Sequence, residues 1–554
     1  MHDLARRMRR LHPRAVRFTR TERGRSAVLL AFTVAMGMEL WTGAGMSLIL
    51  PFLTGTLSAS ADEASWLITV YATAFAVSIA MSHRLASYFG NRNYLVTSCL
   101  TYAVTSLGCA LSPWLALMLV LRAVQGFAGG AFLVRAIVFF RHDYSHPRER
   151  LRASLIFCGL MYIPGRVIAP IVSGYMTDTI GWQWMFVPTA VAMTICAWVF
   201  HRYTAERIKG DTEKIRFDFP GFFLLIVGMC SLQVVLSRGE VDGWFESPFI
   251  CISAIAAIFG FALFAVWQMM RANRHPLLDL HQLRFNRAVL SSTVVGVAIG
   301  ALLGGPLYVL PQFFRVLGRH SATQTGCLLA INGATAAILF GLPQARTWLL
   351  RLGGRLGLAL IMLIQAAAML LFAHYMTSDT PDYYFWLPLI LFGVYVSVGF
   401  PAVVTWAYRG SRSHFASNGF ALYFGTRQVG MTIGVALSAI LIDRRMTLHS
   451  ARLEEAFYAR NLAVLGEVPG LSSPSALLHL AGAIKQQALA LAYADVFVVM
   501  AVLSLATILF LPLLPPREPA VRPRRSLRVA DNIAAGLPVP GALDGRGTLV
   551  NVSF

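Results

Sequence analysis

Long apolar stretches recur along the whole chain and constrain its fold more than any other feature. About fourteen of them approach the roughly 20 residues that a helix needs to cross a bilayer. They lie approximately at residues 26–50, 64–82, 94–112, 114–140, 153–176, 184–201, 219–237, 247–270, 288–313, 324–345, 355–375, 383–408, 416–442 and 493–515. Lipid offers no hydrogen-bond partners, so a single span of this length satisfies its backbone only as a helix. The sequence therefore predicts an all-α polytopic membrane protein with about fourteen transmembrane helices.

Composition and charge distribution support this interpretation. Only 13% of residues are charged, whereas a soluble protein has about 25%. The net charge of +21 could indicate nucleic-acid binding, but the arginines concentrate in alternate connections between the spans. These basic connections fall within residues 1–25, 83–92, 141–152, 202–216, 271–287, 346–355, 409–412 and 517–528. The positive-inside rule then predicts that both termini are cytoplasmic, and no nucleic-acid partner is expected.

Several enzymatic and metal-binding functions find no support in the sequence. It contains no G-x-x-x-x-G-K-[ST] phosphate loop and no H-E-x-x-H zinc motif. The seven cysteines all fall in apolar spans without metal-ligand spacing, so they are interpreted as small core residues. The chain is not expected to be an enzyme or to bind a metal.

The fourth span carries the most informative motif, the run from Arg122 to Gly130. By its position in the span, Arg122 lies on the order of 12 Å inside the membrane at ~1.5 Å per residue. A guanidinium there costs roughly 2.5–3.5 kcal/mol, so it needs a partner. Gly126 and Gly130 follow it at helical spacing, with Gln125 on the same stripe, and small residues allow a neighbouring helix to approach closely. The alternative is a packing face whose arginine is satisfied by backbone carbonyls.

The first span contains a carboxylate, Glu39, between Met38 and Trp41. A carboxylate at that depth is costly unless it is protonated or paired. Proton exchange by Glu39 would suit a proton-coupled machine, and a purely structural pairing with an arginine is the compatible alternative.

Two further arginines are predicted at membrane depth. Arg166 lies near Pro164 and Pro170 in the fifth span, where the prolines loosen the helix. Arg427 lies beside Gln428 in the thirteenth span. The alternative for the fifth span is a kinked helix that only packs against its neighbours.

Counting the spans divides the chain into repeated halves. The predicted parts are a basic cytoplasmic segment, a six-helix half, a linker, an inserted helix pair, and a second six-helix half followed by a tail. They occupy residues 1–25, 26–201, 202–218, 219–270, 271–515 and 516–554. An outer loop at 443–492 is expected to hold a short amphipathic helix, a turn region at 466–475 and a second helix that leads into the last span. Secondary transporters are commonly built from such halves, with the site at their interface.

The run from Arg122 to Gly130 resembles the fourth-helix motif of the major facilitator superfamily. Other segments resemble its fourteen-helix drug:proton antiporter branch, the EmrB/QacA-like exporters. These segments lie at residues 181–188, 218–245, 276–280, 310–318, 444–453 and 487–497. The resemblance covers about residues 26–515 and implies the major facilitator fold of two six-helix halves plus two inserted helices.

The inner-loop motif departs from the family pattern. His83, Ser87 and Tyr88 stand where glycine, aspartate and arginine are usual, and only Gly90 and Arg92 fit. This departure puts the usual gating interaction in doubt.

Two helix motifs also depart from the pattern. The fifth-helix motif is reduced to Pro170 and Gly174 with small neighbours. The acidic residue of the first helix stands at Glu39, about one turn before the position of Thr42, where such chains carry it. One turn keeps it on nearly the same helix face.

The resemblance implies an exporter of small amphiphilic compounds in the bacterial inner membrane, driven by the proton gradient without a cofactor. Glu39 is expected to carry the proton, with Arg122 as its charge partner. The substrate cavity is expected to include Met38, Trp41, Gln125, Arg166, Arg427 and Gln428. The surplus of deep arginines favours weakly acidic cargo. A periplasmic adaptor protein and an outer-membrane channel are the implied partners, besides membrane lipid. The alternatives are a dedicated exporter of one metabolite or siderophore, and a non-transporting sensor on a transporter fold.

Overall fold

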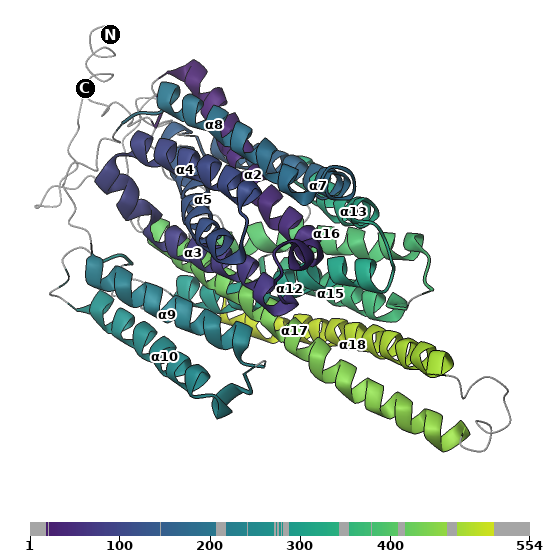
Figure 1. The fold of residues 1–554 in the computed structure, drawn as a ribbon. Coiled ribbons are helices and arrows are strands. Elements are labelled where there is room, and N and C mark those ends of the chain that lie inside the picture. Colours follow the sequence, from purple (N-terminus) through teal and green to yellow (C-terminus); the bar gives the residue numbers. More distant parts are fainter. Residues whose placement is uncertain are drawn as a thin grey trace, which may run out of the picture. The chain divides into compact units, whose positions relative to one another are not determined.

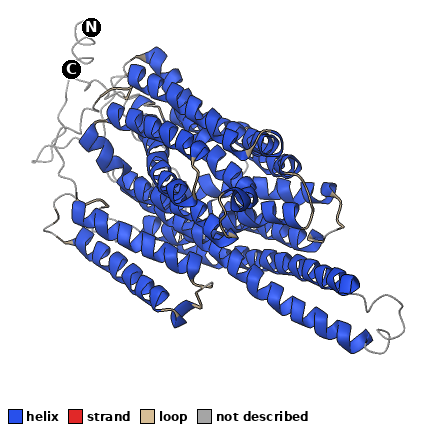
Figure 2. Cartoon of the chain, in the orientation of Figure 1, coloured by secondary structure: helices blue, strands red, loops and turns tan. Residues whose placement is uncertain are grey.

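The computed structural model describes residues 18–19, 21–144, 146–206, 218–240, 242–270, 273, 276–278, 280, 287–342, 354–377, 379–407, 416–461 and 474–514. Regular structure in these ranges is helical throughout, apart from one isolated bridge between Thr19 and Thr204 (Figure 2). Fourteen helical segments are long and apolar enough to cross a membrane. The predicted all-α polytopic fold is therefore confirmed.

Some predicted segments lie outside the described residues. They are the basic segment up to residue 17, the linker at 207–217, the turn region at 466–473 and the tail at 516–554.

The first six spans form one bundle (Figure 1). They are α2 (Glu22–Thr56), α3 (Ala61–Phe89), α4 (Asn91–Leu111), α5 (Leu115–Asp143), the composite α6 (Pro147–Tyr162) with η1 (Ile163–Ile168) and α7 (Ala169–Thr179), and α8 (Phe186–Tyr203). Helix α3 packs along α5, α4 packs along α8, and α2 contacts α8 and η1. This arrangement brings the middle of α2 close to α3 and α5.

The fifth span is broken as the prolines predict. A π-helical turn, Ile163–Ile168, separates α6 from α7. Pro164 and Pro170 each remove a backbone donor, and a π turn accommodates the resulting irregularity. Arg166 lies within this π-helical turn, so the irregular part of the span carries a cation.

The last six spans form a second bundle. They are α12 (Arg287–Val316), α13 (Ala322–Gly341), α15 (Gly354–Tyr375), α16 (Trp386–Ala407), α17 (Ala416–Asn461) and α18 (Pro474–Phe510). Helix α12 packs along α17, because glycines on both helices allow backbone contact: a Cβ at Gly300 would lie 2.1 Å from the Arg427 carbonyl oxygen, and one at Gly430 would lie 2.1 Å from that of Val297. The two bundles meet where α13 contacts η1 and α7, and where α17 contacts α3.

Helices α17 and α18 extend well beyond a bilayer. They contain 46 and 37 residues, or roughly 70 and 55 Å at 1.5 Å per residue, against a hydrocarbon core of about 30 Å. In Figure 1 they project from the bundle as a pair. Residues 443–461 are helical, as predicted, but they continue α17 to Asn461 instead of forming a short helix of their own, because no proline or glycine interrupts them.

Polar contacts fix the base of this pair of helices. Arg444 of α17 binds Glu240 with Nε 2.7 Å from Oε1, and His449 Nε2 lies 2.9 Å from Asp495 Oδ2 on α18. The hydrogen bond from Arg444 lowers the pKa of Glu240 below its usual 4.5, and slight burial opposes it only weakly. The carboxylate therefore stays charged, and this ion pair persists, throughout the physiological pH range.

The inserted pair consists of α9 (Phe219–Arg238) and α10 (Pro248–Met269), which pack mainly on each other. Asp218 caps α9 by accepting a hydrogen bond from the Gly221 N–H at 3.0 Å. It also accepts bonds from Trp267 Nε1 at 2.7 Å, Gln268 Nε2 at 2.8 Å and Asn273 Nδ2 at 2.9 Å. Burial alone would raise the pKa of this carboxyl, but these four donors together hold it below its ordinary 3.8.

We expect Asp218→Ala to lower the free energy of unfolding by about 2 kcal/mol, since it removes a helix cap and charge-assisted bonds. Because the pKa of Asp218 is lowered, its contribution is present at all pH values above the ordinary range. It is lost only as the pH falls through the lowered pKa. The drop in melting temperature of the purified protein should therefore be equal at pH 5 and pH 8. Asp218→Asn keeps the cap, so its melting temperature should lie between those of the wild type and Asp218→Ala. An alanine variant as stable as the wild type would contradict this role.

Candidate functional site: a carboxylate and three arginines between the two bundles

Glu39 lies at the centre of α2 and is only 8% exposed. The Tyr71 hydroxyl of α3 donates a hydrogen bond to Glu39 Oε1 at 3.1 Å. That hydroxyl also lies 3.1 Å from the Tyr102 hydroxyl of α4, which in turn lies 2.5 Å from Thr42 Oγ1. A chain of hydroxyl groups thus connects the carboxylate to three helices.

Arg122 lies on the other side of Tyr71. Its guanidinium carbon stands 4.3 Å from the centre of the Tyr71 ring, a cation–π arrangement that strengthens away from water. Its Nη1 donates to Gln125 Oε1 at 2.7 Å, and Gln125 Nε2 donates to Ser106 Oγ at 2.7 Å. Arg122 is 1% exposed, so the cost of burying its charge is offset by this ring and these acceptors.

Tyr71 therefore joins Glu39 to Arg122, and the two charged groups form no ion pair in the described structure. The direct charge pair expected from the sequence is replaced by an indirect one: the hydroxyl binds the carboxylate and the ring face binds the guanidinium. A change in the protonation of Glu39 would therefore alter the position of the Tyr71 side chain, and with it the contact between the Tyr71 ring and Arg122.

Two more arginines surround the carboxylate. Arg166 from η1 and Arg427 from α17 lie close enough to act electrostatically on Glu39, as Arg122 does. The Nε of Arg166 is buried and has no hydrogen-bond partner among the described residues. The Arg427 guanidinium stands 5.4 Å from the Phe424 ring, and its Nη1 lies 3.5 Å from Met431 Sδ. Three guanidinium groups, which come from both bundles, thus lie within electrostatic range of one carboxylate.

Glu39 is the only described buried acidic side chain at mid-span. The other two buried carboxylates in the described ranges, Asp143 and Asp218, are at helix ends. Asp143 accepts the backbone N–H of Phe18 at 2.5 Å and that of Thr19 at 3.1 Å, which fixes the chain that precedes α2. These carboxylates have local structural partners, so neither duplicates Glu39.

Glycines set the spacing around Arg122 as the sequence predicts. A Cβ at Gly126 would lie 2.3 Å from the Tyr71 carbonyl oxygen, and one at Gly130 would lie 2.6 Å from Ser78 Cβ. Only glycine allows α5 to approach α3 this closely, and the approach places the Tyr71 ring over Arg122.

A second glycine seam joins the two bundles. A Cβ at Gly326 of α13 would lie 2.1 Å from the Pro170 carbonyl oxygen, one at Gly333 2.3 Å from that of Arg166, and one at Gly174 2.4 Å from that of Ala322. At the end of the seam, Asp178 accepts the Thr323 N–H at 2.8 Å. The predicted packing residues Pro170 and Gly174 thus lie at the interface between the halves.

The remaining residues predicted to line the cavity have several different surroundings. Trp41 is 4% exposed and donates from Nε1 to the Met185 carbonyl at 3.0 Å, which fixes it against the start of α8. Met38 is buried. Gln125 belongs to the Arg122 network, and Gln428 faces a separate pocket between α3, α9 and α17. Of the predicted cavity residues, the structure brings Gln125, Arg166 and Arg427 to the cluster.

The degenerate inner loop has its own polar contacts. Gly90 has a φ of +84°, which favours glycine, and Arg92 Nη2 lies 3.5 Å from Glu206 Oε2. Asn91 accepts the Arg135 guanidinium of α5, with Nε at 2.8 Å. The side-chain amide of Asn91 therefore binds the buried Arg135 beside this loop, in which Ser87 replaces the usual aspartate.

Tyr71, Tyr102 and Ser106 are site residues that the sequence pattern did not indicate, and it indicated Thr42 only as the position at which such chains carry the acidic residue. Each is a hydroxyl-bearing residue inside an apolar span, a weak signal because such residues also satisfy their own backbone. Which of them face Glu39 depends on helix rotation, and the sequence does not fix that rotation.

We expect Tyr71→Phe to lower the rate of proton-driven transport about tenfold. The ring remains over Arg122, but the charge-assisted hydrogen bond to Glu39, worth roughly 1.5–3 kcal/mol, is lost. Tyr71→Ala removes both contacts and should lower the rate further. Initial rates in membrane vesicles with matched protein amounts would measure this, and a phenylalanine variant at the wild-type rate would refute the linking role of the hydroxyl.

Two helical bundles with a buried charged cluster between them define a secondary transporter, the class that places its site where repeated halves meet. The family model of the Major Facilitator Superfamily matches residues 27–435, and the chain belongs to this family.

Individual relatives agree with this assignment. The chain is 25% identical to the multidrug export protein EmrB of Escherichia coli strain K12, over 80% of this chain and 85% of that protein. It is 26% identical to the fatty acid resistance protein FarB of Neisseria gonorrhoeae, over 77% and 83% of the two chains. Among solved structures, it resembles the inward-facing, unoccupied bacterial homologue of the human lysosomal transporter Spinster, with a TM-score of 0.56, 15% identity and coverage of 90% and 100%. That likeness supports the fold alone.

Proposed function

We propose that this chain is a multidrug-type efflux transporter that exports small amphiphilic compounds across the bacterial inner membrane in exchange for protons. The observation that carries the proposal is Glu39, the one buried mid-span carboxylate in the described part of the chain, which lies within electrostatic range of three arginines. The names of relatives such as EmrB agree with it.

The mechanism follows from the contacts of Glu39. Protonation from the periplasmic side removes the charge that holds the Tyr71 hydroxyl, and this frees the ring over Arg122 to shift. The two halves then rock about the glycine seam between η1, α7 and α13. Release of the proton toward the cytoplasm restores the charge and resets the site. Glu39 is the proton carrier, while Tyr71 and Arg122 are positioning residues.

The charge of the cluster favours weakly acidic cargo. Arg122, Arg166 and Arg427 exceed Glu39 by two positive charges, and a desolvated surplus of this kind attracts anions. Arg166, whose Nε is buried without a partner in the described structure, is available to a substrate carboxylate or phenolate. The name of the fatty acid resistance protein FarB agrees with such cargo.

The charge pattern of the connections supports an orientation with both termini cytoplasmic. With both termini cytoplasmic, the projecting parts of α17 and α18 lie on the periplasmic side. We expect this pair of helices to be the docking element for a periplasmic adaptor that leads to an outer-membrane channel. Its exposed apolar residues, including Leu448 and Leu478, provide contact surface.

Transport can be tested in a bacterial strain that lacks its main efflux pumps. Expression of the chain should lower the accumulation of several weakly acidic phenolics, and of cationic dyes to a smaller degree. An uncoupler should abolish the difference. Equal accumulation of every compound with and without the chain would exclude multidrug efflux and favour the metabolite exporter or the sensor.

A further inference from the structure

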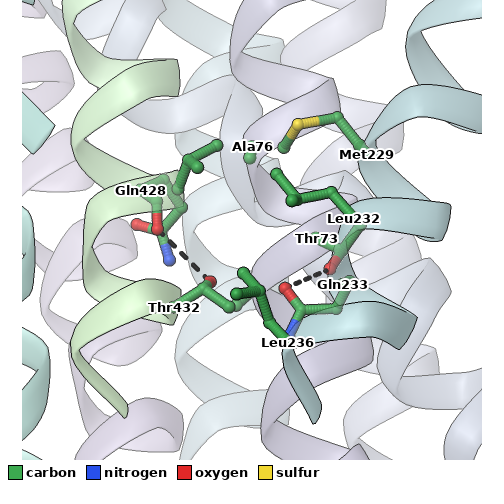
Figure 3. Close-up of a pocket in the computed structure, with 10 residues that line it drawn as sticks. Thr73, Ala76, Met229, Leu232, Gln233, Leu236, Gln428 and Thr432 are labelled. Carbon is green, nitrogen blue, oxygen red and sulfur yellow. Dashed lines mark hydrogen bonds between the residues drawn. The ribbon is translucent and has the colours of Figure 1, made fainter. Parts of the chain in front are cut away.

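A polar pocket lies away from the charged cluster, where α3, α9 and α17 meet (Figure 3). Thr73 of α3, Gln233 of α9, and Gln428 and Thr432 of α17 supply its polar lining, and Met229 and Leu236 supply much of its apolar lining. Its volume of about 10 Å³ is close to the minimum for one water molecule. Polar side chains in a pocket at membrane depth are costly and usually functional.

The hydrogen bonds in the pocket are of a kind that a ligand can replace. Thr73 Oγ1 donates to Gln233 Oε1 at 3.3 Å, and Gln233 Nε2 donates to Ser237 Oγ at 3.0 Å. Thr73 Oγ1 also has its own backbone acceptor, the Thr69 carbonyl at 2.9 Å. Gln233 can therefore turn from Thr73 to a guest without leaving the threonine hydroxyl unsatisfied.

The pocket lies at nearly the same level of α3 and α17 as the charged cluster, but on other faces of these two helices. Tyr71, which binds Glu39, is two residues from Thr73 on α3, and Arg427 immediately precedes Gln428 on α17. Helix α3 belongs to the first bundle and α17 to the second. A rocking motion that separates these two helices would join the pocket to the cluster.

Helix α9 covers this junction and belongs to neither bundle. It contacts α3 and α17, but it packs mainly on α10. It is held at its ends, by the Asp218 cap and by the bond between Glu240 and Arg444. Only 28% of its apolar window is buried, and its close packing is with α10, where a Cβ at Gly260 would lie 2.7 Å from the Gly228 backbone nitrogen. A helix that is fixed at its ends, packs closely on α10 and has much less contact with α3 and α17 can move together with α10 as a cover.

We propose that the seam between α3 and α17 is the lateral path by which substrate passes from the bilayer to the charged cluster, with α9 as its cover. The occupant is a membrane-dissolved amphiphile with a hydrogen-bonding acidic head and an apolar tail. Gln233 and Gln428 receive the head, and Met229 and Leu236 contact the tail. This inference rests on the proposed export function and adds the route and the residues that select for amphiphiles.

The test uses the full-length protein in proteoliposomes with an imposed pH gradient and a long-chain fatty acid that carries a diazirine. Leu236→Trp fills the pocket, and Thr73→Val combined with Gln233→Leu removes polar lining at similar volume. Phe223→Trp is the matched control, since Phe223 lies on the same helix and is 66% exposed. We expect both pocket variants to lower transport of the fatty acid about tenfold and the control to retain the wild-type rate.

Photolabelling separates a path from a packing seam. In wild type, the diazirine should label peptides that contain Thr73, Gln233 and Gln428, and Leu236→Trp should abolish this labelling. Pocket variants that match the control in transport, or labels found only elsewhere, would overturn the proposal and leave the seam as helix packing. A wild-type protein that transports no amphiphile at all would refute the export function itself.

Discussion

Glu39→Gln should abolish uphill export while leaving the protein folded. Glutamine has nearly the shape of a protonated glutamate, so the Tyr71 contact can be replaced by an amide contact. The side chain can no longer bind and release a proton, and no other described mid-span carboxylate substitutes for it. In inverted vesicles with a respiratory pH gradient, accumulation of a weakly acidic substrate should fall to the background of vesicles without the protein.

The matched control is Glu246→Gln, which changes the same chemical group in an exposed connection between α9 and α10. It should retain full activity. Gradient-driven accumulation by Glu39→Gln at a rate near wild type would remove this carboxylate from the coupling mechanism.

Gly326→Ala should have the second large effect, on the motion between the halves. The added methyl group would lie 2.1 Å from the Pro170 carbonyl oxygen, so the helices must separate at the seam on which the halves move. Overpacking of this kind costs about 1–3 kcal/mol. If that cost falls on one conformation alone, the conformational equilibrium shifts by about tenfold or more, and transport should fall by a similar factor.

Gly341→Ala provides the comparison on the same helix. A Cβ at Gly341 meets nothing within 4 Å, so its transport rate should equal that of wild type. Both variants should reach wild-type amounts in the membrane. Equal rates for Gly326→Ala and Gly341→Ala would show that the seam is not a working interface.

The sequence predicted the number and approximate positions of the spans well, because hydropathy is a strong physical signal for a chain in a bilayer. The fourteen spans, the irregular fifth span at Pro164 and Pro170, and the close approach at Gly126 and Gly130 all depend on local properties of the chain. A lipid environment forces those properties to appear in the sequence.

The continuation of α17 to Asn461 was harder to predict from the sequence. Residues after 442 are more polar than those before them. This change from a lipid-facing to a water-facing surface was interpreted as the end of one helix and the start of another. A helix that leaves the membrane keeps its hydrogen bonds and alters only its surface.

The arrangement of the site could also be predicted only in part from the sequence. Glu39 and Arg122 were recognisable because a charge in an apolar span is costly. Tyr71, which lies between them, carries no such cost and could not be placed without knowing the rotation of α3. Gln428 was assigned to the central cavity beside Arg427, although adjacent residues on a helix point about 100° apart, and it lines the pocket under α9 instead.

The most direct test of the central claim is proton movement by the purified protein. Proteoliposomes with an imposed pH gradient and an internal pH dye would receive weakly acidic and cationic compounds in turn. Antiport through Glu39 predicts that substrates collapse the gradient with the wild-type protein and not with Glu39→Gln. Transport of substrate without any change in the gradient, or equal collapse by both proteins, would contradict the account.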